Sequence, residues 1–271
     1  MSVDPHVDAC LAAISSRTDA LVAEAVQLSD EQWDAPTNCA PWRVRELVAH
    51  VTEGGEAFVA CVQRGLAGSV DAPDGDARAR RQAELAEADA GAVAAALQAV
   101  TVEFAQVYEG LDDDALSALC YHRRGNRPVR WYAVHRLSEV AFHEWDVDLS
   151  LGRDPVFPES VAVLILPTLL ESNAPRTYAA GLTPERGTGE RFALGVGGDA
   201  AASWIVQVER DRLVVQRGRA DADLTVTGSA ADLALLVYGR RELPDLVASH
   251  AVRLDGDAEL AGRFGRVFPR P

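Results

Sequence analysis

Three side chains that can bind a metal ion recur at intervals of four residues, namely His135, Glu139 and His143 in the segment WYAVHRLSEVAFHEWDVDLS. In a helix, four residues rotate the chain by about 400° and raise it by about 6 Å, so the three share one stripe. Neighbours on this stripe can close around one ion. His135 and His143 are about 12 Å apart along the axis and cannot both bind it comfortably. The stripe therefore supplies Glu139 with one histidine, and a third ligand must come from another helix.

His50 is the candidate for that third ligand. It lies in VRELVAHVTEGGEAF, at the edge of an apolar stripe that includes Leu47 and Val51, so it can point into the interior of a helical bundle. Two imidazoles and one carboxylate make an open three-ligand site with positions left for water or substrate. Zinc suits this set, ferrous iron, nickel and manganese also fit it, and the residues do not choose among these ions.

The spacing alone leaves alternatives open. A histidine four residues from a glutamate also occurs on solvated helix faces, as a weak ion pair. The period does not decide whether His135 or His143 pairs with Glu139. Asp146, three residues after His143, either orients that imidazole or is an exposed acid near a helix end.

Composition excludes several classes of function. The formal net charge of −15, with a pI near 4.8, argues against nucleic acid or an anionic membrane as partner. All 26 basic residues are arginine, which excludes Schiff-base and pyridoxal-phosphate lysines and the lysine of a P-loop. The four cysteines are scattered, so neither a disulfide framework nor a thiolate zinc cluster is indicated. We expect a cytoplasmic protein, because MSVDPHVDAC lacks a secretory pattern and no run of 18 uninterrupted apolar residues occurs.

The periodicity predicts a mixed fold, α plus α/β, in two domains. The first half is helical, which is typical of an up-and-down four-helix bundle over residues 1–155. A connecting helix and linker follow at 156–180, and a smaller α+β domain at 181–271. We expect helices at 7–27, 43–66, 77–110 (interrupted near 90–91), 131–149, 159–172 and 231–240. We expect strands at 190–196, 203–209, 212–218 and 222–228, then a short strand and a helix in the tail.

Two motifs resemble those of a known family. PWRVRELVAH, which ends at His50, and RLSEVAFHEWD, which spans 136–146, resemble the mycothiol-dependent maleylpyruvate isomerase family of DinB-like metal-binding four-helix bundles. The resemblance implies that His50, Glu139 and His143 hold a divalent metal, usually zinc, and that His135 lies outside the motif. ADADLTVTGSAADLALLVYGR and VRLDGDAELAGRF, in the last 52 residues, resemble the sterol-carrier-like C-terminal domain of that family.

The resemblance also implies a chemistry. Its cofactor is mycothiol, the low-molecular-weight thiol of actinobacteria, and a metal ion stabilises a thiolate that is scarce at neutral pH. In the isomerase the thiolate adds to a cis double bond, the resulting single bond rotates, and elimination gives the trans product. An S-transferase shares the addition and then keeps the adduct or displaces a leaving group. Either reaction needs a small-molecule thiol and an electrophilic substrate, whereas the alternative class is a non-catalytic metal- or ligand-binding module.

Contacts to thiol and substrate are expected from arginines. Arg240 in VYGRREL matches an arginine of the family that reaches the active site, which implies a catalytic role. Arg81 lies in the region where the family uses an arginine, and Trp145 flanks the metal motif, so both are candidates for binding the thiol. The alternative is that the arginines are solvated and that Trp145 packs in the core. The sequence carries no signal for the oligomeric state.

Overall fold

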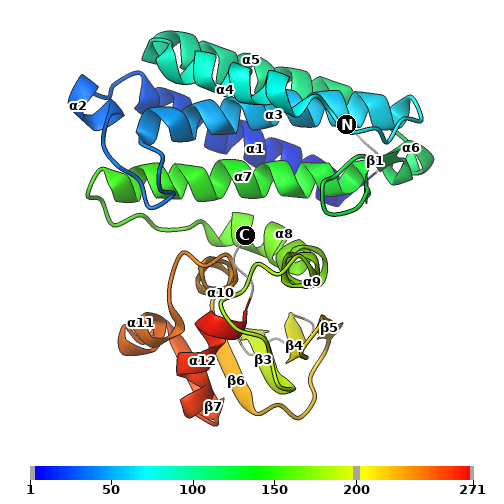
Figure 1. Ribbon diagram of the computed structural model, residues 1–271, viewed down its shortest axis with the longest axis vertical. Helices are drawn as coiled ribbons and strands as arrows, with labels where there is room; N and C mark the ends of the chain where they lie inside the picture. The colour runs from blue at the N-terminus through cyan, green and yellow to red at the C-terminus, as the bar shows by residue number, and fades with distance from the viewer. Residues whose placement is uncertain (1–3, 198–201, 269–271) are drawn as a thin grey trace. The chain divides into compact units, whose positions relative to one another are not determined.

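The computed structural model describes residues 4–197 and 202–268 and divides into two compact units, Met1–Val156 and Phe157–Pro271 (Figure 1). The first is helical apart from two short strands, and the second contains a five-stranded sheet with helices. The mixed fold predicted from the sequence is thus confirmed. The segment expected to connect the domains, 156–180, contributes its helices to the second unit.

Four long helices form the bundle of the first unit: α1 (Pro5–Ala25), α3 (Val44–Leu66), α5 (Ala90–Val107) and α7 (Val129–Ser150). Each packs on two others, in the cyclic order α1, α5, α3, α7 (Figure 1). The shorter elements are α2 (Asp30–Trp33), α4 (Gly75–Glu87), α6 (Asp113–Ser117), β1 (Leu119–Cys120) and β2 (Arg127–Pro128). Because α3 and α7 are neighbours in this ring, side chains from both can meet inside the bundle.

Capping side chains set the helix boundaries. Asp4 accepts hydrogen bonds from the backbone N–H groups of His6 and Val7, which starts α1 two residues earlier than its apolar period indicates. The expected interruption near residue 90 is a complete break, because Asp89 caps α5 and Ala88 is extended.

Helix α5 is long and apolar enough, by length and composition, to cross a membrane, and it is the one such helix in the described part of the chain. It packs on α1 and α3 and buries Val93, Leu97, Val100 and Phe104. Helix α5 therefore buries one face in the bundle.

Glycines on α3 differ in the space around them, which yields a matched pair of variants. A Cβ on Gly65 would lie 2.4 Å from Cys120 Sγ and 2.9 Å from Leu119 O, where β1 crosses the helix, whereas a Cβ on Gly54 would have no atom within 4 Å beyond the backbone of its own helix and its chain neighbours. We expect Gly65→Ala to destabilise the protein by about 1–3 kcal/mol through overpacking. Gly54→Ala should be neutral or stabilise by up to about 1 kcal/mol through helix propensity. Thermal and urea unfolding check this; equal melting temperatures for the two variants would contradict it.

The sheet of the second unit has the strand order β5-β4-β3-β6-β7. The strands are β3 (Glu190–Val196), β4 (Ser203–Val208), β5 (Leu213–Arg217), β6 (Leu224–Gly228) and β7 (Val252–Gly256). Strands β3 and β6 run parallel and the other pairs antiparallel. Alternate residues on one face, including Phe192, Leu194, Leu224 and Val226, are fully buried. The period-two pattern predicted β3, β4, β5 and β6 to within two residues, because apolar residues recur at alternate positions along them.

Among the described residues, six helical segments accompany the sheet. They are α8 (Glu159–Thr168), η1 (Leu169–Asn173), α9 (Ala174–Ala179), α10 (Ala230–Val237), α11 (Leu243–Ala248) and α12 (Glu259–Val267). The helix expected at 159–172 is longer and irregular: a π-helical turn at η1 follows Pro167 and carries the chain on into α9. Gly239, with φ +73°, follows α10 and ends it earlier than expected.

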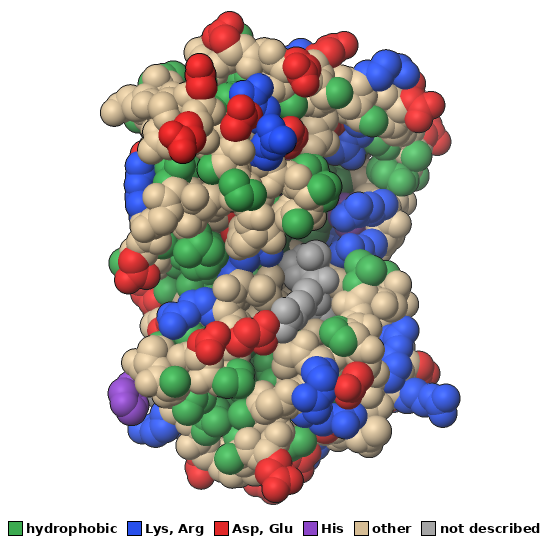
Figure 2. All heavy atoms as spheres, turned by 60° about the vertical axis from the view of Figure 1, so that its left-hand side comes forward, with side chains coloured by type: hydrophobic (Ala, Val, Ile, Leu, Met, Phe, Trp, Pro, Cys, Tyr) green, Lys and Arg blue, Asp and Glu red, His purple; other side chains and the backbone are tan. Residues whose placement is uncertain are grey.

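On the face of the molecule shown in Figure 2, acidic and arginine side chains are interspersed among apolar ones. The acidic excess of the chain is therefore distributed over that face rather than gathered at one place.

Candidate metal site

His50 of α3 meets Glu139 and His143 of α7. Nε2 of His50 lies 3.5 Å from Glu139 Oε2, and Nε2 of His143 lies 3.7 Å from the same oxygen. One ligand atom from each residue lies within 4.8 Å of the others, and the two imidazole rings meet edge-on with centroids 5.3 Å apart. Two nitrogens and one carboxylate oxygen at such separations are the donor set of a divalent-metal site. His50 is the most accessible of the three, with 24% of its side chain exposed, against 7% for His143.

The two oxygens of Glu139 face different histidines. Oε2 faces His50 and His143, whereas Oε1 lies 4.0 Å from Nδ1 of His135. The imidazole of His135 packs between Phe58 and Trp131, with ring centroids 5.0 Å and 4.4 Å away. The structure therefore groups His143 with His50 and leaves His135 on the other side of the carboxylate.

Asp146 contacts Nδ1 of His143, the ring nitrogen opposite the one that faces Glu139. Its Oδ2 lies 3.0 Å from His143 Nδ1, and the carboxylate is fully buried, so it is not an exposed acid at a helix end. A carboxylate on Nδ1 favours the tautomer whose Nε2 lone pair is free to bind a metal. Asn38 donates to Oδ1 over 2.9 Å, and the Cys39 thiol donates to Oδ2 over 3.2 Å.

Asn38 and Cys39 are site residues that sequence reasoning missed. They lie in the loop APTNCAPW between α2 and α3, more than 100 residues from Asp146 in the chain. Thr37 orders this loop, because its hydroxyl donates to Trp42 O over 2.7 Å and accepts from Cys39 N. The one available signal was an Asn-Cys pair just before the motif that carries His50.

The charges of the site are coupled. Burial acts to raise the pKa of Glu139, but hydrogen bonds with His143 and His50 and the charge of His135 outweigh it and hold that pKa well below its usual value. Burial acts to lower the pKa of His143, but Asp146, Cys39 and Glu139 raise it well above its usual value. The pocket therefore favours a positive charge between two carboxylates, which is the environment that a bound cation needs.

Arg136 links the two helices that carry the ligands. Its buried guanidinium donates from Nη1 to Val51 O on α3 over 2.6 Å, one residue after His50. A Cβ on Gly55 would lie 2.9 Å from Arg136 Cζ, so the glycine makes room for the guanidinium. Burial lowers the pKa of Arg136 to about 10, although the charge of Glu139 acts in the opposite direction. The arginine is therefore charged at neutral pH and fixes α7 against α3.

The other predicted site residues lie as follows. Arg81 on α4 forms an ion pair with Glu56 on α3, with Nη2 2.7 Å from Oε1. Glu56 lies six residues after His50, which is about 9 Å along α3. Trp145 is 8% exposed, and its indole N–H donates to Pro155 O over 3.3 Å. Arg240 lies in the second unit, its guanidinium 5.1 Å from the centre of the Tyr238 ring.

Fold and site together define a class: a four-helix bundle with a His, Glu, His donor set between two helices, followed by an α+β domain. Residues 11–148 match the mycothiol maleylpyruvate isomerase N-terminal domain, and residues 183–269 match the SCP-2 sterol transfer family. The first match covers half of the chain, so this protein belongs to the mycothiol maleylpyruvate isomerase family. The family inferred from the motifs is confirmed.

Solved structures show the same fold. The crystal structure of a mycothiol-dependent maleylpyruvate isomerase superposes on this chain with a TM-score of 0.63. The match covers 98% of this chain and 96% of that one, and the two sequences are 17% identical. A histidine-to-alanine mutant of a mycothiol-dependent maleylpyruvate isomerase gives the same TM-score and coverage at 16% identity. No curated protein matches the chain significantly. At this level of identity the likeness establishes the two-part architecture.

Proposed function

We propose that this protein is a divalent-metal enzyme that uses mycothiol to isomerise an unsaturated diacid, such as maleylpyruvate, from cis to trans. The observation that carries the proposal is the convergence of His50, Glu139 and His143, all within the range that matches the family's N-terminal domain. The whole-chain likeness to a mycothiol-dependent maleylpyruvate isomerase supports the same reaction.

The residues present fit a metal ion, and zinc is the ion that we propose. His50 and His143 would bind through their Nε2 atoms and Glu139 through Oε2, since these atoms already face one another. A bound divalent ion would lower the pKa of a coordinating thiol, so that the thiol is held as the nucleophilic thiolate. Asp146 orients the His143 ring, and Arg136 keeps the two helices in register.

The proposal assigns further roles outside the metal ligands. We propose that Arg240 binds a carboxylate of the substrate and that Arg81 and Trp145 contribute to binding the thiol. Guanidinium groups form paired hydrogen bonds with carboxylates, which supports the role of Arg240. We also propose a soluble enzyme of the actinobacterial cytoplasm. The packing of one face of α5 against α1 and α3 supports solubility, and the family's thiol supports the source.

The test is an isomerisation assay with and without mycothiol, together with metal analysis of the purified protein. We expect about one divalent ion per chain in the wild type and little in His50→Ala and Glu139→Ala, because each variant removes one of three ligands. Isomerisation should require both thiol and metal, stop on chelation and return when zinc is restored. Glu103→Gln, an exposed site on α5, is the matched control.

The products of the assay distinguish an isomerase, an S-transferase and a binding module. Release of the trans diacid with the thiol unchanged supports the isomerase. Accumulation of a thioether between thiol and substrate would show S-transfer instead. Thermal stabilisation by mycothiol in the presence of metal, without turnover of any electrophile, would identify a binding module. Equal and negligible metal in the wild type and both variants would refute the metal site itself.

A further inference from the structure

Two glycines are adjacent on α3, and the space beside each is different. A Cβ on Gly55 would lie 2.9 Å from Arg136 Cζ, so packing explains the absence of a side chain there. Gly54 is also buried, yet among the described residues a Cβ on it would meet no atom within 4 Å beyond the backbone of its own helix and its chain neighbours. Alanine would fit at this position and would favour the helix. Packing within the chain therefore does not explain Gly54.

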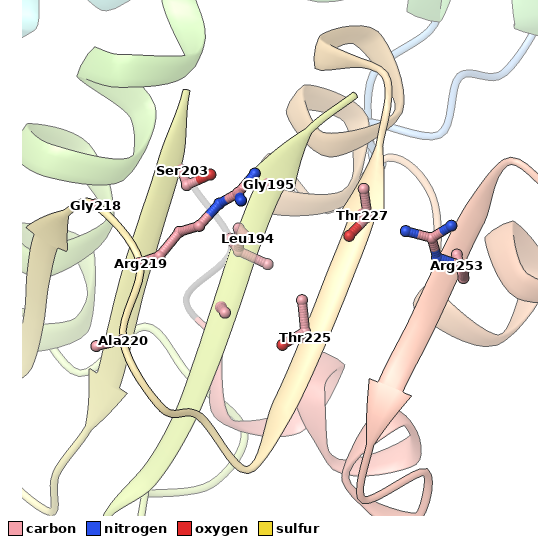
Figure 3. Close-up of a pocket in the computed structure, with 10 residues that line it drawn as sticks. Leu194, Gly195, Ser203, Gly218, Arg219, Ala220, Thr225, Thr227 and Arg253 are labelled. Carbon is pink, nitrogen blue, oxygen red and sulfur yellow. The ribbon is translucent and has the colours of Figure 1, made fainter. Parts of the chain in front are cut away.

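Another glycine with room beside it is Gly195 on β3. A Cβ there would lie 3.5 Å from Ser203 Oγ, and the residue lines a cavity of about 310 Å³ on the sheet of the second unit (Figure 3). The residues that line this cavity all belong to the second unit and include no ligand of the proposed metal site. Of the two spaces, the one at Gly54 is on a helix that carries a proposed ligand.

Ring contacts give the register between α3 and α7. The rings of His50 and His143 meet with their centroids 5.3 Å apart. Eight residues later on α3, the ring of Phe58 meets that of His135, with centroids 5.0 Å apart. Eight residues forward on α3 thus correspond to eight residues backward on α7. The two helices run antiparallel and are in contact along the stripe that carries the proposed ligands.

Gly54 lies opposite the carboxylate of the proposed metal site. It is one turn after His50 and one turn before Phe58, so it belongs to the same stripe of α3. In the antiparallel register its counterpart on α7 is Glu139, midway between the two histidines of the ring contacts. The side chain that Gly54 lacks would therefore point toward Glu139. We call the open space at this point the Gly54 space.

The residues around the Gly54 space indicate what it can hold. The rings of His50 and Phe58 stand one turn away on either side along α3, and Glu139 lies across from it. Each of these three side chains is partly exposed, so the space has an entrance from solvent. Aromatic walls suit a planar, uncharged group, and the charge of Glu139 repels a carboxylate. In the proposed reaction the thiol binds the metal, which leaves the electrophile to occupy the space beside it.

We infer that the Gly54 space receives the uncharged, double-bonded carbon chain of the electrophile, and that Gly54 determines which substrates can enter. The identity of the electrophile rests on the proposed function. The absence of a side chain lets the double bond approach the metal ligands, while the carboxylates at its ends stay away from Glu139. A larger side chain at residue 54 would fill the space and leave all three ligands in place, so Gly54 is a specificity-determining residue.

The test compares Gly54→Val with Ala60→Val in the full-length, zinc-loaded protein. Both variants place a valine on α3, but Ala60 is exposed. Calorimetric titration with maleate, a cis-unsaturated diacid, should show saturable binding to the wild type and to Ala60→Val. Binding to Gly54→Val should be at least about tenfold weaker, because the valine occupies the space that the carbon chain needs. The kcat/KM for isomerisation should fall at least as much, whereas zinc affinity should be equal in all three proteins.

Gly54→Ala keeps the test decisive if the valine variant does not fold. Its methyl group has room, so the protein should fold, as circular dichroism and the melting temperature verify. Maleate binding should weaken in the order glycine, alanine, valine. The inference is overturned if zinc-loaded wild type does not bind maleate saturably. It is also overturned if folded Gly54→Val, or Gly54→Ala where valine prevents folding, binds maleate as the wild type does.

Failure of the proposed function gives a different result. A wild type that binds zinc and maleate but isomerises no diacid refutes the proposed reaction. In that case the binding series at residue 54 still decides whether the Gly54 space holds the unsaturated chain.

Discussion

Glu139→Gln is expected to strip the protein of its metal and, with it, of the proposed isomerase activity. Glu139 is the single carboxylate of the three-ligand set, and one of its oxygens faces both ligand imidazoles. Glutamine preserves the shape but is neutral, and its NH₂ group can only donate, so it leaves at most one weak ligand atom. The loss of metal affinity should exceed the roughly 10- to 100-fold that follows removal of a residue that merely orients a ligand. Calorimetric titration with the metal measures the loss of affinity, and the isomerisation rate of the same protein measures the loss of activity.

Two histidine variants sharpen this test, because His135 and His143 stand at equal distances from Glu139 in the sequence. His143→Gln should lose the metal, whereas His135→Gln should keep it, since His135 faces the other oxygen and packs between Phe58 and Trp131. Retention of metal by His143→Gln together with its loss from His135→Gln would show that the ion lies on the opposite side of Glu139.

The three proposed metal ligands show what residue spacing in the sequence can predict about the site and what it cannot. Helical geometry alone requires a ligand from a second helix, because four-residue steps cannot bring His135 and His143 to one ion. It does not distinguish the two histidines, since both precede or follow Glu139 by one turn. What distinguishes them in the structure is the neighbouring helix: α3 places His50 beside His143 and Phe58 beside His135. That pairing depends on helix packing, which no periodicity within α7 contains.

The groups around Asp146 were less accessible to prediction. A buried carboxylate and an exposed one look alike in sequence, and the choice here depends on Asn38 and Cys39, which supply its hydrogen bonds from a loop 108 and 107 residues away. Because loop geometry follows from specific local hydrogen bonds, such as those of Thr37, composition marks the loop without saying which side chains it presents.

The fold likewise has elements that periodicity predicts and elements that depend on local geometry. The strands were predicted closely because their apolar residues recur at alternate positions, and the long helices because their apolar residues recur near the helical period. The short helices α6 and α11 have only five and six residues, too few for a period to emerge. The π-helical turn at η1 likewise depends on local backbone geometry next to a proline, which sequence marks only as an irregularity.

Asp146→Asn is the second change with a large expected effect, and it acts on the metal through His143. In the wild type, Asn38 donates to one oxygen of Asp146, while Cys39 and His143 share the other. Asparagine has one acceptor and one donor group, so it cannot accept hydrogen bonds on both sides as the carboxylate does. If its NH₂ faces His143, the ring must accept at Nδ1 and carry its proton on Nε2, where the metal ligand is needed. If its NH₂ faces Asn38 instead, Asn38 must turn its amide over to accept, and His143 then faces a neutral amide oxygen in place of a carboxylate.

Either arrangement should weaken metal binding about 10- to 100-fold while leaving the three ligands in place. Asp148→Asn is the matched control, because it removes the same charge two residues along α7 from a carboxylate that pairs with Arg153 near the surface. Competition against a chelator of known affinity measures the difference between the two variants. Should Asp146→Asn and Asp148→Asn bind zinc equally well, His143 would owe its orientation to helix packing alone, and the Asn38 and Cys39 loop would have no part in the site.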